Sequence, residues 1–216
     1  MSELEILKIV ASIIALAIAI IGHEIMHGFI AYKYGDNTAK NAGRLSINPI
    51  VHVDLVGTIL IPAILYFTGA PFLFGWAKPV PVNMNTVIRN GGYNGAMGVA
   101  LAGITYNLIL ATLLATILPL FLQPQTYTEA FFTLLITQSI MINVVLAVFN
   151  LWPIPPLDGS QFIMYLAAKL KLFKVVEFYE KIFPYGIIVL FGILFIPQLS
   201  HLLFLPVGWI LNLILP

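Results

Sequence analysis

The sequence has no cysteine and very little charge: 9% of its 216 residues are charged, whereas 60% are hydrophobic. Without cysteine, disulfide bonds and thiolate metal ligands are excluded. A soluble domain is about a quarter charged, so this chain has too few polar side chains to cover a surface in water. A bilayer removes that requirement, because lipid tails solvate an apolar exterior.

The chain also lacks a strong excess of either charge. Its formal net charge is +1 and no basic tail or patch stands out, so nucleic acid is not an expected partner. The first apolar run follows Glu3 and Glu5 rather than a basic cluster. It then leads into His23 without a small-residue cleavage site, so we expect a membrane helix there rather than a cleaved signal peptide.

Long apolar runs predict an all-α polytopic membrane protein, because about 20 apolar residues cross the hydrocarbon core as a helix. We expect about six transmembrane helices, and a short helix from Asp158 to about residue 172. The expected spans are 4–34, 55–74, 96–122, 130–151, 185–196 and 199–215. The polar connections are short, so we expect a single domain over residues 1–216, with a core at about 4–172 and C-terminal helices at 175–216.

Basic residues gather in three connections, at residues 33–48, 78–93 and 169–181. Lys33, Lys40 and Arg44 belong to the first of these. The positive-inside rule places all three connections in the cytoplasm. Residues 48–78 must then enter and leave the membrane on one side, as a re-entrant element or as two short passes.

The run Gly-Trp-Ala-Lys-Pro-Val-Pro-Val at residues 75–82 contains two prolines that exclude a helix. We therefore expect a re-entrant or extended segment near residues 75–83, beside protein or a wet cavity. An edge strand there could hold an extended substrate by strand addition, with the prolines limiting indiscriminate pairing. The candidate substrate-binding residues are Trp76, Ala77, Lys78, Pro79 and Val80, together with Asn150.

His23, Glu24 and His27 form an H-E-x-x-H sequence in the first predicted helix. Four residues span just over one turn, so both imidazoles project from one face, about 6 Å apart along the axis. This spacing suits two ligands of a tetrahedral zinc ion, with Glu24 accepting a proton from water. The pattern also occurs on solvated helices. Here, each ionisable group would cost roughly 2–4 kcal/mol to bury in a membrane without a partner, which favours a metal site.

A catalytic zinc ion takes a third protein ligand and keeps one position open. Most acidic residues lie in predicted loops or near the chain ends, whereas Asp158 follows the 130–151 segment on the side to which the first helix delivers His27. Taken alone, an Asp-Gly pair after a proline-rich run is a common helix N-cap. Opposite a histidine pair that lacks a third ligand, we interpret Asp158 as that ligand.

These motifs resemble those of the site-2 protease family of intramembrane zinc metalloproteases. The two hallmarks are His23-Glu24-x-x-His27 and Asn150-x-x-Pro153-x-x-Pro156-x-Asp158-Gly159. Residues 43–49, His52, 57–58 and 75–82 resemble the compact bacterial and archaeal branch without PDZ or CBS domains. The likeness spans roughly residues 20–165. One departure is Ala102-Gly103-Ile104, where the family often has Ala-Gly-Pro.

The resemblance implies an endopeptidase that cuts in or near a transmembrane helix of another membrane protein, in regulated proteolysis or in clearance of signal remnants. It implies one Zn²⁺ per chain on His23, His27 and Asp158, with Glu24 as general base and no other cofactor. The implied setting is a prokaryotic cytoplasmic membrane, with the site near the cytoplasmic face. The implied partners are the substrate and the bilayer, with a regulatory membrane protein or a second copy as further candidates.

Other polar residues carry weaker hypotheses. Asn107 and Asn143 lie in predicted spans, where an amide is by default an interhelical hydrogen-bonding group, with a catalytic role as the alternative. Asn150 either hydrogen-bonds the substrate or holds the proline-rich loop, or it caps the helix that it ends. His52 and Asp54 are either interfacial residues of the 48–54 turn, which we favour, or a pair that supports the metal ligands or forms an alternative metal site.

Three rival functions remain open from the sequence. A transporter would use His23 and Glu24 as a proton or metal relay, although no inverted repeat is evident. A catalytically silent relative would bind membrane partners, yet all four catalytic positions are present. A zinc hydrolase acting on lipids or prenylated peptides is the third, but the Asp-Gly turn differs from a downstream helical glutamate as third ligand.

Overall fold

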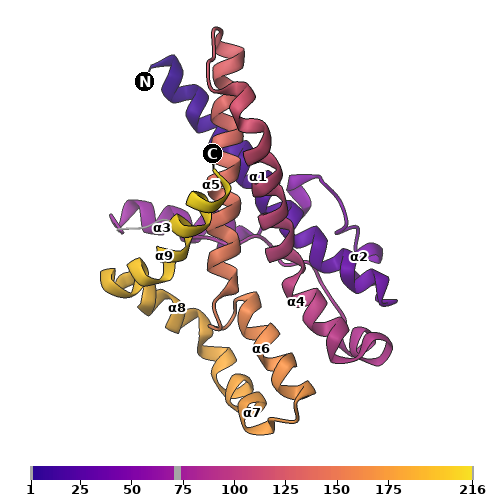
Figure 1. Cartoon of the computed structure of the whole chain (residues 1–216). Coiled ribbons are helices and arrows are strands. Elements are labelled where there is room, and N and C mark those ends of the chain that lie inside the picture. The colour runs from indigo at the N-terminus through magenta and orange to yellow at the C-terminus, as the bar shows by residue number, and fades with distance from the viewer. Residues whose placement is uncertain (1, 71–73, 216) are drawn as a thin grey trace.

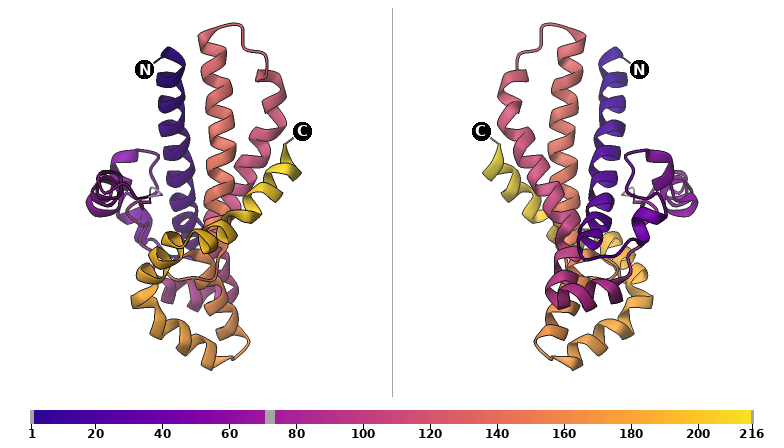
Figure 2. Two further views of the ribbon diagram at one scale, coloured as in Figure 1. Left: turned by 90° about the vertical axis from the view of Figure 1, so that its left-hand side faces the viewer. Right: turned by 90° about the vertical axis from the view of Figure 1, so that its right-hand side faces the viewer.

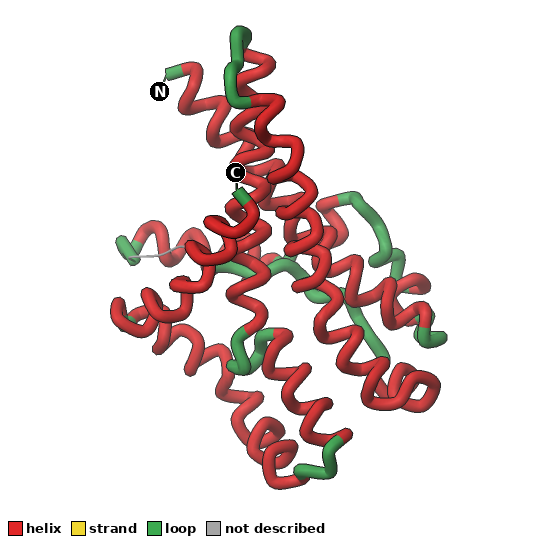
Figure 3. Tube along the Cα trace, viewed as in Figure 1, coloured by secondary structure: helices red, strands yellow, loops and turns green. Residues whose placement is uncertain are grey.

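The computed structural model describes residues 2–70 and 74–215, and every regular element within those residues is a helix (Figures 1 and 3). Among the described residues, five helical runs are long and apolar enough to cross a membrane. They are Glu3–Lys33, Met84–Phe121, Tyr127–Leu151, Phe173–Phe195 and Pro197–Ile214. The predicted all-α polytopic membrane class is therefore confirmed.

Three long helices form the core: α1 (Glu3–Lys33), α4 (Met84–Ile117) and α5 (Tyr127–Leu151). Each packs against the other two. In α1, Ala11, Ala15 and Ala19 are fully buried at a spacing of four residues, and His23 continues the same stripe. Small side chains let helices approach closely in a membrane, so this face brings His23 into the interior of the bundle.

The remaining helices lie beside the middle and the lower part of this bundle, and the C-terminal helix runs back up along it (Figure 2). The short α6 (Asp158–Lys169) packs on α4 and is followed by α7 (Phe173–Ile182). The chain continues through a 3-10 turn, η4 (Phe183–Tyr185), into α8 (Gly186–Phe195) and α9 (Pro197–Ile214). Helix α9 packs against α5.

The two ends of the bundle differ (Figure 1). The upper end holds the N-terminus and the connection between α4 and α5, which includes the 3-10 turn η3 (Leu118–Phe121). The lower end holds the short α2 (Thr38–Asn41), the start of α4 and the turn between α6 and α7. The three lysine-rich and arginine-rich connections predicted from the sequence thus gather at one end.

The second predicted span differs most from the structure. Residues 48–70 form a 3-10 turn η1 (Pro49–His52), a π-helical turn η2 (Leu55–Leu60) and the short α3 (Ile61–Phe67). The apolar helix Leu55–Phe67 is too short to count among the five candidate spans. Part of the predicted 55–74 span, residues 71–73, lies outside the described residues. Pro62 occupies the first turn of α3, where its fixed φ is compatible with a helix start.

Two predicted connections are partly helical. Helix α4 begins at Met84, where Asn83 caps it by accepting a hydrogen bond from the Thr86 amide. The expected connection 169–181 contains most of α7. Both helices carry polar residues on turns beyond the apolar core, so a search for apolar runs places their starts too late.

The outer surface of the bundle is apolar. Ile13, Ile188 and Leu213 are 62%, 68% and 84% exposed, respectively. In water, so many exposed large hydrophobic side chains would drive aggregation. Lipid tails solvate them without that cost, which agrees with a multi-pass membrane protein.

Candidate metal centre

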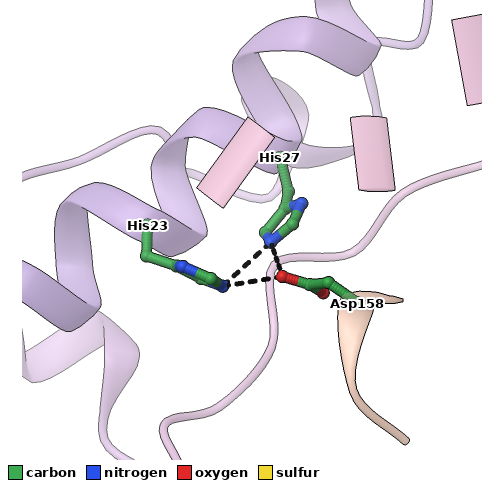
Figure 4. A group of neighbouring side chains, drawn as sticks. All are labelled: His23, His27 and Asp158. Atoms are coloured by element: carbon green, nitrogen blue, oxygen red, sulfur yellow. Dashed lines mark hydrogen bonds and ion pairs between the residues drawn. The ribbon is translucent and has the colours of Figure 1, made fainter. Parts of the chain in front are cut away.

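His23, His27 and Asp158 come together at the junction of α1 and α6 (Figure 4). The Nε2 atoms of the two histidines lie 3.1 Å apart. Asp158 Oδ2 lies 3.1 Å from His23 Nε2 and 3.2 Å from His27 Nε2. Three donor atoms predicted from distant parts of the sequence therefore face one point.

Glycine lets His23 reach this point. The His23 ring packs directly on α4 at Gly103, where an added Cβ would clash with three ring atoms. His23 is only 7% exposed. Gly103 therefore provides the space in which the imidazole lies, and a larger residue there would displace a candidate ligand.

The other ring nitrogen of each histidine faces an oxygen of α4. His27 Nδ1 lies 2.7 Å from the Val99 carbonyl oxygen, which can only accept. His23 Nδ1 lies 2.7 Å from Asn107 Oδ1. When each Nδ1 donates its proton to these oxygens, each Nε2 presents a lone pair to the shared point.

Asp158 is the first residue of α6 and does not cap it. Leu157 occupies the N-cap position, with no side-chain cap hydrogen bond. The Asp158 carboxylate instead turns toward the histidines, and the helix N-terminus favours its negative charge. The N-cap interpretation considered from the sequence therefore does not describe this residue.

The donor set fits a zinc ion. Asp158 Oδ2 is buried, accepts no hydrogen bond among the described residues, and faces the two Nε2 atoms at 3.1 and 3.2 Å. Three converging lone pairs repel one another unless a cation lies between them. Two ligands of a tetrahedral zinc ion with bond lengths of about 2.0–2.1 Å lie about 3.3–3.4 Å apart, close to the observed separations of 3.1 and 3.2 Å.

Glu24 is the fourth predicted catalytic residue. Its carboxylate Oε2 accepts a hydrogen bond of 2.8 Å from the Val80 amide. Glu24 also lines the cavity that contains the two histidines and Asp158. The predicted general base is therefore held by the segment that was predicted to bind substrate, a contact that no sequence pattern indicated.

The segment 75–82 is non-helical, as predicted, although the described residues contain no β-strand. One side of it is fixed by main-chain hydrogen bonds. The Trp76 amide donates to the Gly57 carbonyl at 3.1 Å, and the Lys78 amide donates to the His52 carbonyl at 2.9 Å. Thr58 Oγ1 donates to the Trp76 carbonyl at 2.9 Å. The segment is thus anchored at alternate residues to the 52–58 region.

Arg44 supplies a further anchor. It was counted in the sequence analysis among the cations of a connection, but it is only 6% exposed. Its Nη2 donates to the Lys78 carbonyl at 2.6 Å. Arg44 therefore has a structural role, as a buried donor to a main-chain carbonyl, which a count of charged residues does not reveal.

A cavity of about 500 Å³ surrounds the metal-binding group. Of the candidate substrate-binding residues, it is lined by Trp76, Ala77, Pro79, Val80 and Asn150 but not by Lys78. Asn150 also donates back to the Leu146 carbonyl one turn earlier, at 3.0 Å. A second, largely apolar cavity of about 610 Å³ adjoins the first and shares Ile20, Ala77 and Phe149 with it.

His52 and Asp54 do not join the metal-binding group. His52 is 2% exposed, and its Nε2 faces the Ser46 carbonyl at 2.8 Å. Asp54 caps η2 by accepting from the Gly57 amide at 2.6 Å. His52 is therefore buried within the protein, and its main-chain carbonyl accepts a hydrogen bond from the Lys78 amide of the segment 75–82.

Two curated proteins are similar to this chain. "Putative zinc metalloprotease YwhC" from Bacillus subtilis is 41% identical over 155 residues, which cover 70% of this chain and 66% of that protein. "Putative zinc metalloprotease Rip2" from Mycolicibacterium smegmatis is 30% identical over 137 residues, which cover 63% of this chain and 49% of that protein. The chain belongs to the site-2 protease family.

The similarity is partial in length. This site-2 protease family member matches about half to two thirds of the length of these curated relatives. No protein-family model and no solved structure matches the chain. The names of the relatives agree with a metalloprotease and with the metal-binding group described above.

Proposed function

We propose that this protein is an intramembrane zinc endopeptidase that hydrolyses a peptide bond in or near a transmembrane helix of another membrane protein. The observation that carries the proposal is the convergence of two imidazole Nε2 atoms and one carboxylate oxygen at 3.1–3.2 Å. In this proposal, His23, His27 and Asp158 hold one Zn²⁺ per chain.

Glu24 is proposed as the general base. Zinc, when bound, polarises a carbonyl group and makes water acidic enough to lose a proton near neutral pH. The Glu24 carboxylate, held by the Val80 amide beside the same cavity, accepts that proton as the water oxygen attacks the peptide carbonyl. It then delivers the proton to the leaving amine.

Two features support an extended, apolar substrate. The cavity of the metal-binding group adjoins an apolar cavity that runs along α1 from Ile20 to Ile13. In an extended chain, neighbouring residues direct their main-chain groups to opposite sides. With Trp76 and Lys78 bonded to the 52–58 region, Ala77 directs its N–H the other way, while Pro79 and Pro81 have none to offer. We propose Ala77 as the donor that pairs with the substrate backbone.

We propose that the site lies near the cytoplasmic face of a prokaryotic membrane. His23 precedes the end of α1 at Lys33 by ten residues, which corresponds to about 15 Å along the helix. That end of the bundle carries the connections rich in lysine and arginine, which favour the cytoplasm. The two similar proteins come from bacteria. Water would then reach the site from that side.

The test is to measure zinc content and proteolysis in the same preparations. Wild type and Glu24→Gln, purified in detergent without chelators, are assayed for bound zinc and for cleavage of a panel of single-pass transmembrane substrates. We expect about one zinc ion in each protein and cleavage by the wild type alone, with Glu24→Gln lowering the rate by about 10²–10⁴-fold.

Other results would point to the rival functions. A wild type without stoichiometric zinc, or one that moves metal ions across liposomes without proteolysis, would favour a transporter. Zinc in both proteins with no cleavage of any substrate would favour a silent relative that binds membrane partners. Cleavage of lipids or prenylated peptides instead of transmembrane segments would favour the third rival.

A further inference from the structure

Two buried asparagines connect the metal-binding group to the centre of the helix bundle. Asn107 of α4 and Asn143 of α5 are both 0% exposed. Asn107 Nδ2 donates to Asn143 Oδ1 at 2.7 Å and to the Ala19 carbonyl of α1 at 3.2 Å. One side chain thus bonds to both neighbouring helices and, through Oδ1, to His23.

The direction of this chain of hydrogen bonds is determined at its far end. Asn143 Nδ2 donates to the Ser139 carbonyl at 2.7 Å, and a main-chain carbonyl can only accept. The Asn143 oxygen must therefore face Asn107. The Ala19 carbonyl imposes the same orientation on Asn107, because an amide oxygen placed there would face another acceptor.

The orientation of the Asn107 amide determines the tautomer of His23. Both Nδ2 protons of Asn107 are used, so the atom that it offers to His23 is an acceptor, Oδ1. His23 must then carry its proton on Nδ1, which leaves the Nε2 lone pair facing His27 and Asp158. His27 reaches the same state with a single partner, the Val99 carbonyl.

We infer that Asn107 and Asn143 are positioning residues that hold His23 in the tautomer and ring orientation required for metal binding. This inference rests on the proposed function only in taking zinc as the bound metal. Partners of a ligand's second ring nitrogen typically change metal affinity by about 10–100-fold. The default alternative is that the two amides only join the helices.

The two roles need different atoms of Asn107. Positioning His23 needs the acceptor Oδ1, whereas joining α4 to α1 and α5 needs the Nδ2 donors. Asn107→Asp keeps an acceptor and loses the donors, while Asn107→Leu loses both. At position 143, Asn143→Asp keeps the acceptor that orients Asn107, and Asn143→Leu removes it.

The experiment measures zinc affinity by competition with a chromophoric chelator, using the full chain in detergent and the monodisperse fraction of each variant. Melting temperature in excess chelator is recorded alongside. Val144→Ala is the matched control, because Val144 is fully buried on α5 beside Asn143 and lies outside the amide chain. It is expected to lower the melting temperature and to leave zinc affinity unchanged.

We expect Asn107→Leu to weaken zinc binding by about 10–100-fold and Asn107→Asp to bind zinc at least as tightly as wild type. Equal losses in both variants, or no loss in Asn107→Leu, would overturn the inference. Where the Asn107 variants do not yield folded protein, the pair at position 143 decides by the same criterion. A wild type that binds no zinc would instead contradict the proposed function.

Discussion

The two sides of the candidate catalytic cavity are built differently. One side, here called the inner wall, consists of α1, α4, α5 and the start of α6, with His23, His27, Gly103, Asn107, Asn143 and Asp158. The other, the outer wall, is the segment 75–82 with the residues that anchor it, Arg44, His52, Gly57 and Thr58. The inner wall is held mainly by contacts between buried side chains. The outer wall is held through the main-chain atoms of its segment, which bond to the Gly57 and His52 carbonyls and to the Thr58 and Arg44 side chains.

This difference suits the two tasks. Metal ligands need rotamers fixed by packing and by hydrogen bonds to their second nitrogens. An extended substrate needs a neighbouring backbone with groups left for pairing. Glu24 is the contact between the two, since it follows His23 in α1 but is bonded to Val80 of the outer wall. Substitutions should therefore change metal binding on one side and turnover on the other.

The largest expected effect is on zinc binding, when one histidine of each wall is replaced separately by alanine. His27→Ala removes a proposed ligand and should abolish stoichiometric zinc binding. His52→Ala removes a buried imidazole that faces the Ser46 carbonyl, and it should retain zinc while losing about 1 kcal/mol of stability. Elemental analysis and thermal melting measure the two effects. Loss of zinc in His52→Ala would show that the outer wall also determines metal binding.

A smaller effect is expected from two glycines on the same helix. An added Cβ at Gly103 would clash with the His23 ring, whereas at Gly98 its nearest neighbour is Ile30 Cγ2 at 3.9 Å. Gly103→Ala should therefore weaken zinc binding by about 10–100-fold. Gly98→Ala should bind zinc normally and gain up to about 1 kcal/mol of stability from helix propensity. Equal zinc affinities would contradict the packing argument.

Much of the inner wall could be predicted because its signals are local. The spacing of His23 and His27 places both on one helix face, and the proline-rich run ending at Asp158 indicated the proposed third ligand. The sequence did not predict that Asn107 and Asn143 form a chain of hydrogen bonds to His23. The two residues are 36 positions apart in the sequence. An asparagine in a spanning helix predicts an interhelical hydrogen bond, but it does not identify the partner.

The outer wall was predicted less well for a related reason. Pro79 and Pro81 exclude a helix, so the non-helical segment was expected. Its anchors are two main-chain carbonyls and the side chains of Arg44 and Thr58, whose positions depend on how residues 44–58 fold. Arg44 and His52 are polar residues that a sequence reading places at the surface, but tertiary packing buries both. The contact between Glu24 and the Val80 amide could not be predicted from residue types, because the donor is a main-chain N–H group.

Two proline substitutions should separate the functions of the outer wall. Val80→Pro removes the amide that holds Glu24, so we expect kcat to fall by about tenfold, the value of about one hydrogen bond to a charged group. Ala77→Pro removes the proposed substrate donor and should mainly raise KM. Val80→Ala and Ala77→Ser keep the amides and serve as controls. Zinc content should stay at the wild-type level in all four, and a kcat loss shared by Val80→Ala would assign the effect to the side chain.

The smallest effect on the site is expected at Asp36, where the two walls join. Its buried carboxylate accepts hydrogen bonds from the Thr38 amide at 2.9 Å and from the Asn83 amide at 2.6 Å. Asn83 follows the outer wall and caps α4 of the inner wall. Burial alone would raise the pKa of Asp36, but the hydrogen bonds from Thr38 and Asn83 outweigh it and lower the pKa below 3.8.

Because the pKa of Asp36 is lower in the folded state than in the unfolded state, the ionised carboxylate stabilises the fold above about pH 4. This stabilisation is lost as the pH falls through the folded pKa. Asp36→Asn should therefore melt at a lower temperature than wild type near neutral pH, with the difference shrinking on acidification, while zinc affinity stays unchanged. Glu177→Gln, which breaks an exposed pair with Lys181, should change the melting temperature little at any pH. The measurement is the difference in melting temperature between the wild type and Asp36→Asn from about pH 3 to about pH 7. A difference that does not change with pH would show that the junction does not depend on this charge.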